Sequence, residues 1–146
     1  MSHYLLSIAV SRPKGVCLVE LYDSGKVIKS KSGSFLGDNI KKNALRYIHR
    51  GLRMSAPVVS HEDVLCIEVR DPFVATWVRD CISRDDYNDL LDMVFSDINE
   101  LDCQWRIVCG DYIRAENHLD GALKSLSEKT ESTVCLDDAI QDLEGN

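Results

Sequence analysis

The chain has 146 residues, of which 45% are hydrophobic, and it carries a formal net charge of −7. This length and composition provide one compact core and no more. No run approaches the ~18 apolar residues of a membrane span, and no basic and then apolar leader opens the chain. We therefore exclude a membrane-spanning protein and expect residence in the cytoplasm.

Charge is distributed unevenly along the chain. Residues 1–79 hold 12 basic and 7 acidic side chains, whereas residues 80–102 hold 1 basic and 8 acidic side chains. The last twenty residues have a net charge of −5. This separation of charge argues against a general affinity of the whole protein for nucleic acid, but it is compatible with one basic face.

The first part of the chain predicts three strands and a helix, in this order: 4–10, 16–22, 26–34 and 40–54. Asp23-Ser24-Gly25 is a hairpin signal between the second and third strands. The third strand has few apolar residues and is expected at an exposed edge. Asp38 or Asn39 is expected to cap the helix.

The second part predicts a strand, two helices, a strand and a last helix. A strand over 64–69 precedes Asp71-Pro72, where a short helix begins because proline suits the first helical position. Asp85 is expected to cap a longer helix that ends at Leu101. A strand over 105–109 and a helix over 114–126 follow. From Ser127 the chain is polar and acidic, which indicates a loosely docked or disordered tail.

The cysteines and histidines lack the spacing of a metal site. No two of the six cysteines form a CxxC pair, and the four histidines are equally scattered. We expect reduced, buried, inert thiols and no metal or other cofactor. The six cysteines are Cys17, Cys66, Cys81, Cys103, Cys109 and Cys135.

The order of elements, β-β-β-α-β-α-α-β-α, resembles that of the ribonuclease H fold, an α/β class with a mixed sheet. The most specific part of the resemblance is the stretch after the last strand, where Gly110, Glu116-Asn117 and Leu119 to Leu123 follow the spacing of that family's final loop and helix. The resemblance extends over residues 4–126. We therefore expect a ribonuclease H-like domain over residues 1–126 and an acidic tail over residues 127–146.

The resemblance implies a catalytic site of four carboxylates that hold two Mg²⁺ ions. They would lie in the first strand, in the first helix, at the end of the fourth strand and in the last helix. No acidic residue precedes Glu20, and none lies between Asp38 and Glu62. Val10 and Asn43 stand at the first two positions instead, so we expect no hydrolysis of the family's kind.

The third position is ambiguous. Asp71 lies near the expected place, but aligning Phe73 and Val74 with the family's helix puts Arg70 in the ligand position. Asp71 also has a sufficient structural role as the cap of a helix that begins with proline.

The fourth position is displaced by one residue. Asp120 follows Asn117 by three residues, whereas the family pattern has four, so Gly121 occupies that register. One residue turns a helix by about 100°, which would point Asp120 away from the metal. The loop residue after Gly110, often histidine in the family, is Asp111. We expect the metal site to be dismantled.

Other catalytic arrangements find no more support. Cys109 and His118 lie near each other in sequence, but a cysteine nucleophile also needs a third, orienting group. The chain has no glycine-rich phosphate loop. We therefore predict that the protein is not an enzyme.

The favoured hypothesis is a catalytically silent protein-interaction module. It would bind a protein through its acidic tail or through its acidic helix, whose candidate residues are Asp85, Asp89, Asp92 and Glu100. A viral or phage accessory protein that occupies a nucleic-acid enzyme in the host cytoplasm would be of this type. The bland alternative is that the acidic face is simply solvated.

Two other hypotheses stay open. Sequence-independent binding of nucleic acid would use a basic face, although aromatic residues for base stacking are only 7% of the chain. A residual nuclease would use a rearranged metal site built from Asp71, Asp111, Glu116 or Asp120. The residues of the basic face are Lys26, Lys29, Lys31, Lys42, Arg46, Arg50 and Arg53.

Overall fold

The computed structural model describes the backbone of residues 1–131 and the side chains of residues 1–127. All but the first five residues of the predicted tail lie outside the described residues. The strands are β1 (His3–Ser11), β2 (Val16–Asp23), β3 (Lys26–Ser34), β4 (Val64–Val69) and β5 (Gln104–Cys109). The helices are α1 (Ile40–Ser55), α2 (Pro72–Arg79), α3 (Asn88–Leu101), the 3₁₀ helix η1 (Arg114–His118) and α4 (Leu119–Glu131). The predicted order of elements is confirmed.

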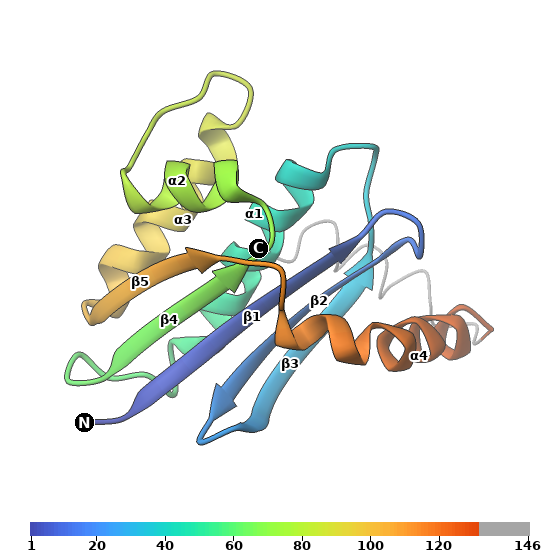
Figure 1. The fold of residues 1–146 in the computed structure, drawn as a ribbon, viewed down its shortest axis with the longest axis horizontal. Coiled ribbons are helices and arrows are strands. Elements are labelled where there is room, and N and C mark those ends of the chain that lie inside the picture. Colours follow the sequence, from blue (N-terminus) through green and yellow to red (C-terminus); the bar gives the residue numbers. More distant parts are fainter. Residues whose placement is uncertain (132–146) are drawn as a thin grey trace.

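The strands form one five-stranded mixed sheet in the order β3-β2-β1-β4-β5 (Figure 1). β1 pairs antiparallel with β2, and β2 pairs antiparallel with β3. β1 and β4 are parallel, as are β4 and β5, so the carboxyl ends of these three strands meet at one edge. The predicted hairpin joins β2 and β3, where Ser24 and Gly25 both have positive φ.

Helices cover both faces of the sheet. α1, α2 and α3 lie on one face, and η1 and α4 lie on the other (Figure 1). The main core is on the α1 side, where Leu6, Leu45, Ile48 and Leu91 are fully buried. The core beneath η1 and α4 is much smaller, and it contains Ala9, Val16, Leu18, Ala115 and Leu119.

Gly51 allows α1 to approach the sheet closely. A Cβ atom at this position would lie 2.6 Å from Val19 Cγ2 and 2.8 Å from Leu6 Cδ2. Real side-chain contacts are longer than this, because carbon atoms attract best at about 3.5–4.0 Å. Glycine is therefore a packing residue here and has no role as a helix breaker.

Two helix boundaries differ from the prediction. α3 begins at Asn88, and Asp85 is an exposed residue of the preceding loop, so its predicted role as a cap is wrong. The reason is that Asn88 Oδ1 accepts a hydrogen bond from Arg84 N at 2.8 Å, which closes a turn before the helix. The predicted last helix is a 3₁₀ turn over Arg114–His118 followed by α4, which runs past residue 126 to Glu131.

The expectation that the cysteines are buried is only partly correct. Cys17 is buried and Cys66 and Cys103 are half-buried, but Cys81 and Cys109 are exposed. These five thiols are free, and Cys135 lies outside the described residues. Among the residues that the structure describes, no helix has the length and apolar character to cross a membrane.

Candidate functional site

The first two positions implied by the family resemblance are structural. Val10 is partly buried and packs against the main core. Asn43 is fully buried, and its Oδ1 accepts a hydrogen bond from Leu36 N at 3.0 Å. Its Nδ2 donates to the carbonyl oxygens of Leu36 and Asn39, both at 2.8 Å. Asn43 therefore holds the loop between β3 and α1, and its polar atoms are occupied.

Asp71 caps α2, as the Asp-Pro pair predicts. Its Oδ1 accepts hydrogen bonds from Phe73 N at 2.8 Å and Val74 N at 3.2 Å. Its Oδ2 lies 2.9 Å from Lys41 Nζ, and the Lys41 ammonium lies 5.0 Å from the centre of the Phe73 ring. Both oxygens of this carboxylate therefore have donors from the protein.

Arg70 follows β4 directly and is exposed. Its Nε donates to Glu116 Oε2 at 2.7 Å, its Nη2 donates to Glu116 Oε1, and Nη2 also donates to the carbonyl oxygen of Asp111 at 2.8 Å. The hydrogen bonds to Glu116 raise the pKa of Arg70. A guanidinium held by a bidentate carboxylate thus occupies the end of β4.

The carboxylates proposed for a residual nuclease do not converge on a shared site. Asp120 is exposed in the first turn of α4, next to the exposed Gly121, and its Oδ1 lies 2.7 Å from Lys14 Nζ. Asp111 is an exposed loop residue. Within residues 1–131 no group of three or more His, Cys, Asp or Glu side chains is placed to hold a metal ion. The edge of the sheet therefore carries carboxylates neutralised by Lys14, Lys41 and Arg70.

The η1 side of the sheet contains a buried polar layer that the sequence did not predict. Glu20, Ser7 and Glu68 are register partners across β2, β1 and β4. Ser7 Oγ donates to Glu68 Oε2 at 2.7 Å and accepts from Ala115 N at 2.9 Å. Arg114 donates to Glu68 from its backbone N at 2.7 Å and from Nη1 at 2.8 Å. These contacts attach η1 to the sheet.

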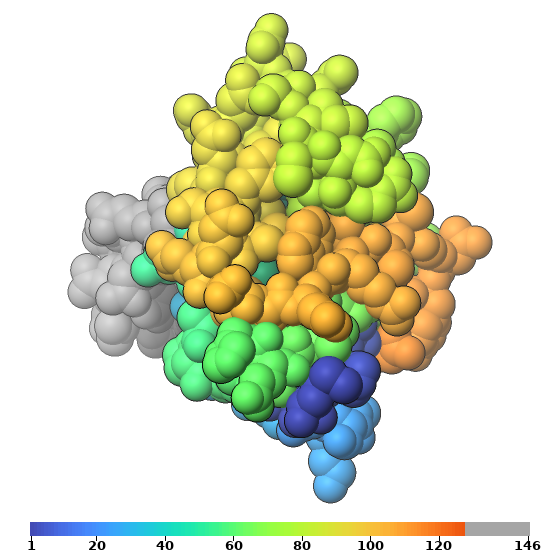
Figure 2. All heavy atoms as spheres, turned by 90° about the vertical axis from the view of Figure 1, so that its left-hand side faces the viewer, coloured from blue at the N-terminus to red at the C-terminus, as the bar shows by residue number. Residues whose placement is uncertain are grey.

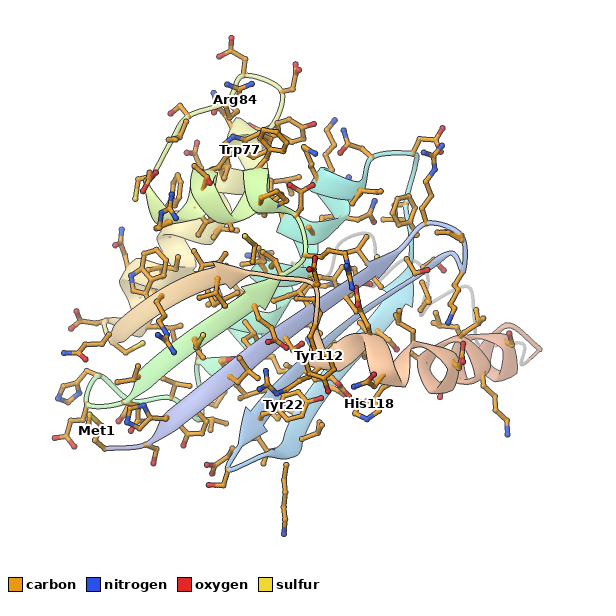
Figure 3. All side chains as sticks on the ribbon, viewed as in Figure 1. Met1, Tyr22, Trp77, Arg84, Tyr112 and His118 are labelled. Atoms are coloured by element: carbon orange, nitrogen blue, oxygen red, sulfur yellow. The ribbon has the colours of Figure 1, made fainter. Side chains whose placement is uncertain are left out.

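Glu20 continues this layer toward His118. Its Oε1 accepts a hydrogen bond from the Tyr22 hydroxyl at 2.8 Å and lies 2.7 Å from His118 Nδ1. Tyr22 and His118 lie together beside α4 (Figure 3). The pKa of Tyr22 is raised, mainly because its hydroxyl is desolvated and to a lesser extent because that hydroxyl donates to Glu20. The signal available in the sequence was one polar residue at an inward position of each otherwise apolar strand.

The acidic residues of α3 are exposed, as predicted. Asp89, Asp92 and Glu100 are solvent-exposed, and none of them has an ion-pair partner in the described part of the chain. α3 forms an outer face of the molecule, in yellow in Figure 2. The same helix also carries Asp97, which is buried and pairs with His49 of α1. α3 therefore has an unpaired acidic side and a paired inner side.

The predicted basic residues lie partly together. Lys29 and Lys31 pair with Leu21 and Val19 of β2, which places them on the α1 side of the sheet. Arg50, which the sequence places on the basic face, is only 7% exposed, and its Nη1 donates to the hydroxyl of Tyr47 one turn earlier, at 3.1 Å. The other six have no ion pair among the described residues: Lys26, Lys29, Lys31, Lys42, Arg46 and Arg53.

Solved structures confirm the fold. The chain is similar to the N-terminal RNase H domain of a Mycobacterium tuberculosis protein, with a TM-score of 0.61 and 11% identity, over 86% of this chain and 99% of that one. It is also similar to RNase H1 from the archaeon Halobacterium salinarum, with a TM-score of 0.59 and 14% identity, over 94% of this chain and 98% of that one. No family model and no curated protein matches the sequence. The chain has a ribonuclease H-like fold.

Proposed function

We propose that this ribonuclease H-like domain is catalytically silent and binds a protein with a basic surface through the acidic face of α3. This face consists of Asp85 in the preceding loop together with Asp89, Asp92 and Glu100. The proposal depends on a difference in pairing between two groups of carboxylates. The carboxylates of Asp71, Glu116 and Asp120 are paired with cations of the same chain, whereas those of the acidic face have none among the described residues.

Unpaired like charges on one helix repel each other, and a basic partner relieves that repulsion. Complementary charge also raises the rate of encounter and rejects acidic competitors. The carboxylates of the acidic face are spread from Asp85 to Glu100, so the negative electrostatic potential extends along the whole helix. The proposal therefore predicts a partner with a run or patch of lysine and arginine.

Three observations support the absence of hydrolysis. The positions that the family resemblance assigns to the first two carboxylates hold Val10 and Asn43. Asp71 pairs with Lys41 and Glu116 pairs with Arg70, whereas two-metal chemistry needs carboxylates that are free to bind the ions. The similar proteins are named as RNase H, so the proposal requires that this chain has kept their fold without their reaction.

The experiment compares two double variants in affinity purification from the native host or cell. Asp89→Asn with Asp92→Asn removes two charges from the acidic face, and Asp111→Asn with Asp120→Asn removes two charges at the sheet edge. We expect one stable partner to be lost from the first variant and retained by the second. Retention by both variants, or loss from both, would contradict the proposal.

The second candidate function is sequence-independent binding of nucleic acid. The six basic residues of β3 and α1 that have no ion pair in the described part of the chain favour it. A parallel salt titration with RNA–DNA hybrid, duplex DNA and single strands tests it, because log K falls with log salt by about 0.9 per phosphate neutralised on B-DNA. Steep salt dependence without a protein partner would favour this candidate. Mg²⁺-dependent cleavage of the hybrid would refute both.

A further inference from the structure

We propose that the hollow between α1 and α3 binds the cationic end of a lysine or arginine side chain from the partner. This inference rests on the proposed function and specifies its anchor point. The hollow has a volume of about 330 Å³. His49 and Arg53 of α1 line it from one side, and Asp92, Asp97 and Glu100 of α3 line it from the other.

The first observation is a buried histidine nitrogen without a partner. His49 is 3% exposed, and its Nδ1 is hydrogen-bonded to Asp97 Oδ2. Its Nε2 has no hydrogen-bond partner among the residues that the structure describes. Buried polar atoms nearly always have one. His49 is one of the residues that line the hollow, and we infer that a group bound there supplies the missing contact.

The tautomer indicates what kind of group this is. With the imidazole proton on Nδ1, where Asp97 Oδ2 accepts it, Nε2 is a lone-pair acceptor. It needs an N–H or O–H donor. A carboxylate or phosphate offers neither when ionised, which leaves a donor ligand.

The charges around the hollow indicate the sign of the ligand. Asp92 and Glu100 are exposed and unpaired within the described residues, and Asp97 lies between them on α3, whereas Arg53 is the one arginine or lysine of the lining. An anion is repelled by this set and a cation is attracted. No metal-binding group of three or more ligands occurs among residues 1–131. The ligand is therefore an ammonium or guanidinium ion.

The size and walls of the hollow suit one side chain. A volume of about 330 Å³ is at the low end of small-molecule pockets. Met93 is half-buried in the lining, where its flexible thioether contacts the methylene groups of a long side chain. Arg53 repels a second cation. We infer that one basic residue of the partner occupies the hollow while its neighbours face the rest of the acidic face.

The test uses capped tetralysine, capped tetra-arginine and a capped tetranorleucine control at constant ionic strength. Binding is measured by calorimetry, and the ¹⁵N chemical shift of His49 Nε2 is followed during the titration. We expect the two basic peptides to bind and to shift Nε2, and the norleucine peptide to do neither. Asp92→Asn and Glu100→Gln should each weaken binding about fivefold, the equivalent of one charge pair.

Asp89→Asn is the matched control, because it removes the same charge from the same helix outside the hollow. Because Asp89 belongs to the acidic face, we expect it to weaken binding too, but only about twofold, which is less than the loss in Asp92→Asn or Glu100→Gln. Equal losses in Asp89→Asn, Asp92→Asn and Glu100→Gln, or an unchanged Nε2 signal, would overturn the hollow as an anchor while leaving the acidic face as the binding surface. No binding of any basic peptide, with no partner in the purification, would overturn both proposals.

Discussion

Replacing Gly51 by alanine tests the close approach of α1 to the sheet. The added Cβ would lie 2.6 Å from Val19 Cγ2 and 2.8 and 2.9 Å from the two δ-methyl groups of Leu6. Leu6 and Val19 are both fully buried. All three methyl groups must therefore move, and the surrounding core leaves them little room.

Two effects of opposite sign decide the outcome. Alanine is favoured over glycine inside a helix by about 1 kcal/mol. Overpacking a filled core costs about 1–3 kcal/mol, and three contacts this short belong in the upper part of that range. We expect Gly51→Ala to lower the free energy of unfolding by about 1–2 kcal/mol. For a chain of this size the melting temperature falls by roughly 3–6 °C.

Urea and thermal unfolding measure this change against a control. Gly121→Ala in α4 is matched, because nothing lies within 4 Å of its added Cβ. It should stabilise the protein by several tenths of a kcal/mol, up to about 1 kcal/mol. Val19→Ala removes the shortest contact, so it should be less costly in the Gly51→Ala background than alone. A rise in melting temperature in Gly51→Ala that equals the rise in Gly121→Ala would refute the reasoning.

Three more predictions follow from the same structure. A disulfide reagent should label Cys81 and Cys109 in the native protein, whereas Cys17, whose pKa burial raises to about 12, should react only on unfolding; mass spectrometry identifies the sites. Arg114→Ala removes the cation from the buried Glu68 and should cost about 1–3 kcal/mol in urea unfolding, less than a fully buried pair because Arg114 is half-exposed. Arg106→Ala, an exposed arginine, should change little, and equal losses would contradict the role of Glu68. Hydrogen bonds from the backbone N–H groups of Ser60 and Ser2 lower the pKa of Asp63. The stability lost in Asp63→Asn should therefore be constant above about pH 4, the pKa of an unfolded aspartate, and should shrink as pH falls through the lower native pKa, as urea midpoints at several pH values will show.

The sequence predicts the strands and helices better than it predicts which side chains pair with each other. Apolar runs together with turn and capping signals predict the strands and helices, and a count of acidic residues is enough to find that the first strand and first helix lack carboxylates. What replaces them depends on contacts between distant residues. Lys41 pairs with Asp71 over 30 positions, Arg70 with Glu116 over 46 and Lys14 with Asp120 over 106. Nothing local in the sequence indicates these pairs.

The missed features have the same cause. The layer of Glu20, Ser7 and Glu68 exists because β1 pairs with both β2 and β4, and its register is set by the packed sheet. The start of α3 differs from the prediction because Asp85 has the residue type of a cap, yet the helix begins at Asn88, after Tyr87, which makes no side-chain cap hydrogen bond.

The lysines of β3 lie on an end strand of the sheet, where they have a second possible role. Among the described residues β3 is an end strand of the sheet, and it exposes Val27 and Ile28, so this edge and its apolar side chains invite pairing with another strand. Lysine at a sheet edge disfavours such pairing, so we expect Lys26, Lys29 and Lys31 to oppose assembly edge to edge. This role of the three lysines needs no nucleic acid, so the basic residues of α1 are the more specific test of the second candidate function.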